Sequence, residues 1–395
     1  MNEIQTKYVV LGSGAAGVTA AAAIRDRDPE GRIVLVSGEK EMTYKRPMLS
    51  KTPLRSLRRA CVALHEDNWY EGQRIELLLS RQVLALDTAQ KTVTLEDGAI
   101  RFEKCVYALG GTNFVPPFKG VELPGVLTVR TLEDVRRMKR SAVGEERAVI
   151  IGGGVIGLEI ALELSRYGME VTVLEALPRL MPRQLDPDTS ARLQSLLTGL
   201  HIHTGVTVEE IGGDGRAQWV RLADGRVFPC GLVMVSCGQK ANIAVAQAAG
   251  IACGRAIIVN ARMETSAPDI WACGDCAEYE GVNVALWSQA VAEGMIAGAN
   301  AAGGEEKLAP FDASLILNSE LMSLFALGDL GQNPEKTYEC DVTERRFSDF
   351  SINARLPFAV EKRFYSGGRL VGGCILGNLS GMEGLKQEIL RGAAK

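Results

Sequence analysis

The sequence predicts an α/β protein with two similar doubly wound domains and a small α+β domain at its C-terminal end. Three observations predict this fold class. Near the N-terminus a short apolar run leads into a glycine-rich loop and an alanine-rich run, the same layout returns 140 residues later, and residues 306–395 follow neither copy. Apolar strands alternating with helices indicate a parallel sheet covered by helices, and the repeated layout indicates an internal duplication.

The first glycine-rich loop has the spacing of a phosphate-binding turn. Gly12 permits a tight turn, Gly14 lets a pyrophosphate approach the backbone, and Gly17 lets the following helix lie close to the strand. The N-terminus of that helix supplies amide donors and partial positive charge. A turn that binds nothing is the alternative. Glu39 favours a dinucleotide, because it follows a second apolar run 22 residues past Gly17, where a carboxylate accepts from a ribose hydroxyl.

The second loop repeats this pattern with Gly152, Gly154 and Gly157, and the apolar run that follows it ends at Glu175, 18 residues past Gly157. Two such units predict two Rossmann-like dinucleotide-binding domains. Glu175 lies where a carboxylate accepts from a ribose 2′-hydroxyl.

Breaker-rich segments predict the domain boundaries. Residues 110–125 are rich in glycine and proline and are typical of a crossing segment. The helical run 286–301 has no counterpart between the two units, so it is expected to return to the first domain. The predicted domains are a discontinuous first domain of residues 1–112 and 239–305, a second domain of residues 113–238, and a third domain of residues 306–395.

Composition excludes several classes of protein. With 395 residues, 46% of them hydrophobic, the chain can bury several cores. A net charge of −4 with 23% charged residues gives no sign of a nucleic-acid-binding surface. Little sequence precedes Gly12 and no apolar run has membrane-spanning length, so we expect a cytoplasmic protein without a membrane partner. Nine cysteines without secreted-type spacing predict reduced thiols.

Several motifs in a fixed order carry a family resemblance. The two glycine loops, together with Ala108-Leu109-Gly110 and Ala272-Cys273-Gly274-Asp275, resemble the FAD-dependent pyridine-nucleotide oxidoreductases. Two further segments are similar to the branch with rubredoxin reductases, ferredoxin reductases and the flavin portion of NADH-dependent nitrite reductase: Tyr44-Lys45-Arg46-Pro47-Met48-Leu49-Ser50-Lys51 and Gly157-Leu158-Glu159. The C-terminal stretch is similar to the small terminal domain of anaerobic NADH:rubredoxin reductases.

The resemblance implies FAD in the first domain and NAD in the second. Glu175 would repel a 2′-phosphate, so NADH is expected to be preferred over NADPH, and Arg179 is the nearby residue that weakens this preference. Glu39 is expected at the adenosine ribose of FAD, Arg46 and Pro47 at its phosphate and ring, and Asp275 at a ribityl hydroxyl. The implied FAD contacts are Gly12, Gly14, Ala15, Ala16, Gly17, Glu39, Arg46, Pro47, Lys51, Val83, Ala108, Gly110 and Asp275. The remaining implied cofactor contacts are Gly152, Gly154, Val155, Ile156, Gly157, Glu159, Glu175 and Gly238.

Lys51 and Glu159 are the expected catalytic residues. In the family that this chain resembles, the matching lysine and glutamate form an ion pair beside flavin N5, where hydride arrives from the nicotinamide. Such a pair orients both rings and modulates the charge on the reduced flavin. The alternative is that Lys51 belongs to a basic patch and Glu159 is an ordinary helix residue.

The cysteines and histidines offer no second chemistry. Cys273 and Cys276 form a C-x-x-C, which suits a redox dithiol or half of a metal site. It straddles the segment expected at the ribityl chain and has no second C-x-x-C, so structural thiols are favoured and no metal is expected. Cys61 matches no thiol motif of the related reductases. The three histidines are His65, His201 and His203, and none lies in a motif.

The expected function is transfer of electrons from NADH through FAD to a small acidic electron-carrier protein such as rubredoxin. An NADH oxidase, a diaphorase or the electron-input subunit of a larger redox complex is the alternative among enzymes, and an NADH sensor is the alternative of another class. The basic residues Arg55, Arg58 and Arg59 are either a carrier-binding surface or a solvated loop, whereas the run 136–140 is typical of a solvated helix face. The physiological acceptor and the oligomeric state stay open.

Overall fold

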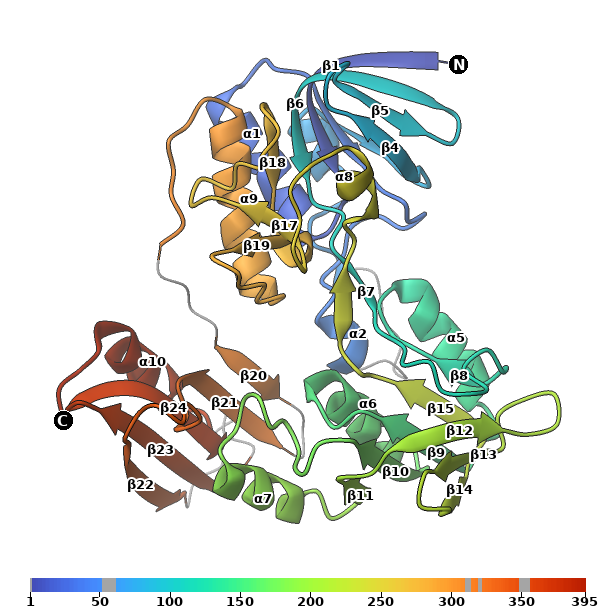
Figure 1. The fold of residues 1–395 in the computed structure, drawn as a ribbon, viewed down its shortest axis with the longest axis vertical. Coiled ribbons are helices and arrows are strands. Elements are labelled where there is room, and N and C mark those ends of the chain that lie inside the picture. Colours follow the sequence, from blue (N-terminus) through green and yellow to red (C-terminus); the bar gives the residue numbers. More distant parts are fainter. Residues whose placement is uncertain (1, 52–61, 310–313, 319–321, 348–355) are drawn as a thin grey trace. The chain divides into compact units, whose positions relative to one another are not determined.

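The computed structural model describes residues 2–51, 62–309, 314–318, 322–347 and 356–395. The chain divides into two compact units (Figure 1). The first unit comprises Met1–Pro47, Leu57–Thr112 and Gln239–Phe311. The second unit comprises Met48–Ser56, Asn113–Gly238 and Asp312–Lys395.

A seven-stranded sheet forms the centre of the first unit, in the order β3-β2-β1-β6-β5-β4, with β18 also paired to β6. The strands β1, β2, β3, β6 and β18 pair in parallel, and β4 and β5 form an antiparallel hairpin. The strands are β1 (Asn2–Leu11), β2 (Ile33–Val36), β3 (Ile75–Leu78), β4 (Val83–Asp87), β5 (Thr92–Leu95), β6 (Gly98–Tyr107) and β18 (Ile270–Ala272).

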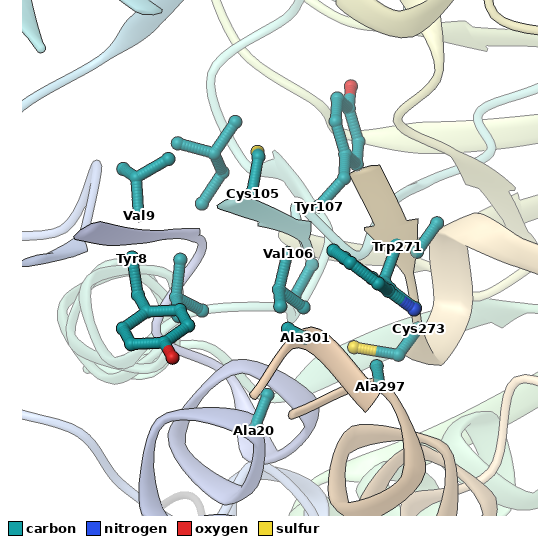
Figure 2. Packing of buried hydrophobic residues seen from close by; sticks show 14 of the residues in the cluster. Tyr8, Val9, Ala20, Cys105, Val106, Tyr107, Trp271, Cys273, Ala297 and Ala301 are labelled. Carbon is teal, nitrogen blue, oxygen red and sulfur yellow. The ribbon is translucent and has the colours of Figure 1, made fainter. Parts of the chain in front are cut away.

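Two helices, α1 (Ala15–Arg27) and α9 (Trp287–Ala301), pack closely together in this unit (Figure 1). A Cβ atom added to Gly294 would lie 2.3 Å from the carbonyl oxygen of Ala16, and one added to Gly298 would lie 2.2 Å from that of Ala20. Small residues therefore let the two backbones touch. Figure 2 shows alanines of both helices on the side that faces the strand residue Val106.

Shorter elements complete the first unit. They are α4 (Trp69–Gly72), β7 (Gly111–Asn113), β16 (Gln239–Ala241), α8 (Ala244–Ala248), β17 (Ile257–Val259), the 3₁₀ helix η1 (Gly274–Cys276) and β19 (Ala277–Tyr279). The strands β7 and β16, which lie in the two segments where the chain passes from one unit to the other, pair with each other.

The second unit contains a five-stranded parallel sheet in the order β11-β10-β9-β15-β8 and a three-stranded antiparallel sheet, β12-β13-β14. The helices are α2 (Met48–Lys51), α5 (Leu132–Ala142), α6 (Val155–Arg166) and α7 (Pro187–Leu196). The strands are β8 (Val126–Leu127), β9 (Arg147–Ile151), β10 (Glu170–Glu175), β11 (His201–Thr204), β12 (Val208–Gly212), β13 (Trp219–Leu222), β14 (Val227–Pro229) and β15 (Leu232–Val235).

An antiparallel sheet with one helix forms the C-terminal part of the second unit. The strand order is β20-β21-β24-β23-β22. Helix α10 buries Leu385 and Ile389 against Phe325 and Ile375 of this sheet. The elements are β20 (Leu315–Asn318), β21 (Ser323–Gly328), β22 (Glu339–Arg346), β23 (Phe358–Ser366), β24 (Arg369–Gly377) and α10 (Met382–Arg391).

The fold class predicted from the sequence is confirmed, since both glycine loops join parallel strands through a helix and a small α+β element ends the chain. The two copies differ in one detail. The first copy continues after its Asp-Gly turn as the single long strand β6, whereas the second is divided into β14 and β15. Among the helices that the structure describes, none has the length and apolar character needed to cross a membrane.

Candidate functional site

The first glycine loop connects β1 to α1, and its three glycines have different surroundings. Gly12 has a φ of +106°, and a Cβ atom there would lie 2.2 Å from the carbonyl oxygen of Ala108. A Cβ atom on Gly17 would lie 1.8 Å from the carbonyl oxygen of Gly12. A Cβ atom on Gly14 would meet no atom within 4 Å. Gly12 and Gly17 are therefore required by packing, and Gly14 faces open space.

The second loop, between β9 and α6, has the same geometry. Gly152 has a φ of +113°, and an added Cβ atom would lie 2.2 Å from the carbonyl oxygen of Ser236. A Cβ atom on Gly157 would lie 2.1 Å from the oxygen of Gly152, and one on Gly154 would meet nothing within 4 Å. The two loops thus present the same open position, which fits the pyrophosphate of a dinucleotide.

The helix ends behind these loops have amide donors without a side-chain cap. Gly14 caps α1 and Gly154 caps α6, and neither helix has a side-chain cap hydrogen bond or an acidic residue in its first turn. In contrast, Thr131 caps α5 and Asp186 caps α7 through their side chains. Uncapped N-terminal amides suit an anionic ligand, so both loops fit a phosphate-containing cofactor.

Glu39 lies beside an arginine and a tyrosine of the neighbouring segment. Its carboxylate accepts hydrogen bonds of 2.5 Å from the Tyr44 hydroxyl and 2.5 Å from the Arg46 guanidinium. Arg46 also donates to the Tyr44 hydroxyl at 3.1 Å. Since a carboxylate has about four lone-pair sites, Glu39 retains capacity for a further donor. The structure therefore joins two of the residues predicted at FAD, Glu39 and Arg46.

Glu175 contacts the second glycine loop directly. Its Oε2 accepts from the backbone N–H of Gly153 at 2.6 Å, and its Oε1 accepts from that of Leu177 at 2.8 Å. Arg179 donates to the carbonyl oxygen of Pro182 at 3.1 Å. The carboxylate predicted to select NADH thus also fixes the backbone of the second glycine loop and of the residues that follow β10.

Asp275 lies in η1, on a turn held by a buried glutamate of α9. Gly274 has a φ of +78°, and its N–H donates to Glu293 Oε2 at 2.7 Å. The Gln289 side-chain amide donates to the other oxygen of Glu293. Burial, together with a smaller effect of the nearby charge of Asp275, raises the pKa of Glu293 to about 7, although the hydrogen bonds from Gly274 and Gln289 oppose this rise. Glu293 was not predicted, because one glutamate in an alanine-rich helix gives no signal in the sequence.

The other predicted contacts lie next to the two loops or at strand ends. Ala15 and Ala16 are buried in the first turn of α1, Val155 is half-buried and Ile156 exposed in the first turn of α6. Ala108 is buried. Gly110 and Gly238 both have a positive φ, +65° and +103° respectively. Val83 begins β4 and is half-buried, and Pro47 is exposed.

Lys51 and Glu159 form an ion pair within the second unit. Lys51, at the end of α2, places its Nζ 3.0 Å from Glu159 Oε1. Glu159 lies on α6, and its side chain is 4% exposed. The Ser50 hydroxyl donates to Glu159 Oε2 at 2.5 Å. Ser50 is a second partner that the sequence did not predict, although it precedes Lys51 in the quoted motif.

The C-x-x-C cysteines are buried thiols. Cys273 and Cys276 are both 0% exposed, and Cys276 Sγ lies 3.3 Å from the carbonyl oxygen of Cys273. Burial raises the pKa of Cys276 to about 12 and that of Cys273 well above its ordinary value. Because thiolates are the reactive form, this environment favours structural thiols.

Some predicted features have no described structure or no site around them. Arg55, Arg58, Arg59 and Cys61 lie outside the described residues. His65 stacks on Trp69 with ring centroids 3.9 Å apart, and His201 and His203 lie on β11. Within the parts of the chain that the structure describes, no three histidine, cysteine or acidic side chains form a group that could hold a metal.

Comparison with known proteins identifies relatives that are named reductases or oxidases of NAD(H). The ferredoxin--NAD(+) reductase subunit of the benzene 1,2-dioxygenase system of Pseudomonas putida is 36% identical over 273 residues, covering 68% of this chain and 67% of that protein. The NADH oxidase of Methanocaldococcus jannaschii is 31% identical over 391 residues, covering 92% of this chain and 83% of that protein.

A third relative is the NADH-rubredoxin oxidoreductase of Clostridium acetobutylicum. It is 30% identical over 337 residues, covering 84% of this chain and 84% of that protein. Its crystal structure matches with a TM-score of 0.76 at 25% identity, covering 99% of this chain and 96% of that chain.

The family itself follows from the larger match. Residues 6–294, which include both glycine loops and the Cys273-Gly274-Asp275 segment, match the family described as pyridine nucleotide-disulphide oxidoreductase. FAD and a pyridine nucleotide are the cofactors of this family, and both loops fit them. The chain therefore belongs to the pyridine nucleotide-disulphide oxidoreductase family, as an FAD-dependent NADH oxidoreductase.

Proposed function

We propose that this enzyme passes electrons from NADH through FAD to a small one-electron carrier protein, with rubredoxin as the favoured carrier. Bound FAD would supply the step between the two-electron donor and the one-electron acceptor. The two glycine loops would hold the two dinucleotides, FAD at Gly12, Gly14 and Gly17 and NADH at Gly152, Gly154 and Gly157.

The observation that carries this proposal is the burial of the C-x-x-C thiols. Cys273 and Cys276 are 0% exposed, and burial keeps the pKa of both far above neutrality. A thiol relay would need an accessible thiolate. Electrons would therefore leave from the flavin directly, as a one-electron carrier requires.

The remaining site residues take roles that suit their surroundings. Glu39 would accept from the adenosine ribose of FAD while holding Arg46 in position, and Asp275 would accept from a ribityl hydroxyl. Glu175 would accept from the ribose of NADH. A carboxylate at each ribose suits the hydroxyl donors there.

Lys51 and Glu159 would act at the reacting rings. A partly exposed ammonium held by a buried carboxylate places a positive charge at a fixed position, and with FAD bound there it would stabilise negative charge on the reduced ring. Ser50, through its hydrogen bond to Glu159, would fix the carboxylate that orients the lysine.

An NADH oxidase is the second candidate function. It is favoured by the relative from Methanocaldococcus jannaschii, which is named an NADH oxidase and aligns with 92% of this chain. Oxygen would then take the place of the carrier, and the same binding residues for FAD and NADH would serve.

Anaerobic stopped-flow kinetics distinguishes these functions. The protein is reduced with one equivalent of NADH and mixed with rubredoxin, with ferredoxin or with oxygen. Fast flavin reoxidation by rubredoxin alone is the expected result. Fast reoxidation by oxygen would show that the protein is an NADH oxidase, and fast reoxidation by ferredoxin alone would identify ferredoxin as the carrier. Slow reoxidation by all three would indicate a sensor.

The carrier interaction gives a second test. Rubredoxins are small acidic proteins, and Arg55, Arg58 and Arg59 lie close to Lys51 in the sequence. Charge complementarity acts mainly on the rate of encounter and is screened over a Debye length of roughly 8 Å at physiological ionic strength. Replacing the three arginines by glutamate should lower the rubredoxin rate at low salt and flatten its salt dependence.

A matched control comes from an exposed helix. Arg136, Arg137 and Arg140 are exposed on α5, so their replacement by glutamate changes the net charge equally without changing residues 55–59. A carrier rate that responds equally to both triple substitutions would assign the effect to net charge and leave residues 55–59 as a solvated loop.

A further inference from the structure

A buried lysine of the C-terminal sheet contacts the start of α7. Lys362, on β23, is 4% exposed, and its Nζ lies 2.8 Å from Asp186 Oδ1 and 2.7 Å from Asp188 Oδ2. Asp186 is 7% exposed. A buried ion pair of this kind gives little net stability compared with apolar packing of the same volume, so another role is worth seeking.

Asp186 holds the N-terminus of α7, and a second contact joins the same segment to the residues between β21 and β22. The Asp186 carboxylate accepts from the backbone N–H of Thr189 at 3.2 Å, which is the side-chain cap of α7. The Gln332 side-chain amide donates to the carbonyl oxygen of Leu185 at 2.7 Å. The C-terminal part of the second unit therefore contacts Leu185, the last residue of the loop formed by residues 176–185, and Asp186, which follows it.

The middle of this loop contacts the second glycine loop. The backbone N–H of Met181 donates to the carbonyl oxygen of Gly153 at 3.3 Å, and that of Leu185 donates to the oxygen of Met181 at 3.0 Å. Leu180 is fully buried, and its Cδ2 lies 2.6 Å from where a Cβ atom of Gly153 would be. Gly153 in turn donates to Glu175.

We propose that Lys362 is a positioning residue for the pyridine-nucleotide site, acting through Asp186 and residues 176–185 on Gly153 and Glu175. This inference rests on the proposed function, in which the second glycine loop and Glu175 bind NADH. The C-terminal sheet thereby contributes to NADH affinity without touching the nucleotide. All the residues that make these contacts belong to the second unit.

The test separates nucleotide binding from flavin reduction in the full-length holoenzyme. Lys362→Met should raise the Kd for NAD+, measured by titration calorimetry, on the order of tenfold, within the range usual for coupling between separate sites. The limiting rate of flavin reduction at saturating NADH should stay unchanged, because Lys51 and Glu159 keep their contact. Lys362→Arg should restore most of the affinity.

Arg363 supplies the matched control. It is adjacent in sequence, donates to Glu361 at 2.7 Å and to Glu388, and makes these contacts within the C-terminal sheet and α10. Arg363→Met should therefore leave the Kd for NAD+ unchanged. An equal loss of affinity in Lys362→Met and Arg363→Met would overturn the inference, since general loosening of the sheet would then explain both.

Two further variants keep every outcome decisive. If Lys362→Met does not fold, Gln332→Ala removes the second contact to Leu185 from an exposed position, and an unchanged Kd in that variant overturns the inference. Gly154→Val tests the underlying assignment separately. Loss of NAD+ binding in Gly154→Val with normal binding in Lys362→Met overturns only the role of Lys362, whereas normal binding in Gly154→Val overturns the location of the site.

Discussion

The carboxylate of Glu293 accepts a hydrogen bond from the backbone N–H of Gly274 at 2.7 Å, so a buried acid of α9 holds the turn that carries Asp275. Burial raises the pKa of this acid from 4.5 to about 7. The folded state therefore binds its proton more tightly than the unfolded state. The stabilising effect of that proton is complete below about pH 4.5 and is lost as the pH rises through about 7.

This titration should appear in the stability of the protein. Between pH 5 and 8 the free energy of unfolding should fall by about 3 kcal/mol through Glu293, since one pKa unit corresponds to roughly 1.4 kcal/mol. Urea unfolding at a series of pH values measures this. The Glu293→Gln protein cannot titrate here, so its stability should fall less steeply over the same range. Parallel curves for the two proteins would contradict the prediction.

Two substitutions in the first glycine loop should separate loss of the cofactor from misfolding. A side chain at Gly14 enters open space, so Gly14→Val should fold and contain no flavin. A side chain at Gly17 meets the backbone of Gly12, so Gly17→Val should destabilise the protein by about 1 to 3 kcal/mol or more, as overpacking does. Flavin absorbance and thermal unfolding measure the two effects. Full flavin content in Gly14→Val would contradict the assignment of the first loop.

Two substitutions of Glu175 distinguish its charge from its hydrogen bonds. Glu175→Gln removes the charge that repels a 2′-phosphate, so the preference for NADH over NADPH should narrow by about 1 to 3 kcal/mol. Glutamine keeps one acceptor oxygen, so either Gly153 or Leu177 loses its acceptor, whereas Glu175→Ala removes the acceptors of both and should weaken the binding of both nucleotides as well. Steady-state kcat/KM with each nucleotide measures this. An unchanged ratio in Glu175→Gln would show that another residue selects the nucleotide.

The ion pair at Lys51 should affect chemistry more than binding. Lys51→Met should lower the limiting rate of flavin reduction by roughly 10²-fold, the usual loss when one positioned electrostatic contact is removed. Glu159→Gln should have a smaller effect in the same direction, because the amide oxygen of glutamine can still accept from Lys51. Lys45, which is exposed, provides the control variant Lys45→Met. A limiting rate of flavin reduction in Lys51→Met equal to that of the wild type would indicate that the lysine is only a member of the basic patch.

The buried thiols should be dispensable for electron transfer. Replacing Cys273 and Cys276 together by alanine should leave NADH-driven reduction of a one-electron dye intact, with FAD still bound. Alanine avoids burying a hydroxyl without a partner. A thiol reagent should label the exposed Cys340 well before either of them. Loss of flavin reoxidation in the double variant would support the dithiol interpretation.

The sequence predicted the features that depend on neighbours along the chain. Glycine spacing, apolar runs and an acidic residue after each second strand located both loops, Glu39 and Glu175. These signals are local, because a turn or a buried strand constrains a few consecutive residues. Strand β22 shows the limit of this approach, since all its residues are exposed and no alternation of apolar and polar residues marks it.

The contacts that could not be predicted join residues that are distant in sequence. Ser50 reaches Glu159 across 109 positions, and Lys362 reaches Asp186 across 176 positions. Neither pair leaves a pattern in one sequence, because the residue types alone do not specify their partners. The Lys51 to Glu159 pair could be expected only because a family resemblance supplied it.

The different surroundings of the glycines in the first loop also bear on how this sequence can change over evolutionary time. The backbone of Ala108, just after β6, and that of the loop itself exclude any side chain at Gly12 or Gly17, with or without a nucleotide. Open space surrounds Gly14, so only a bound ligand restricts that position. A descendant that had lost its nucleotide would therefore keep Gly12 and Gly17 to preserve its fold, and substitutions would accumulate first at Gly14.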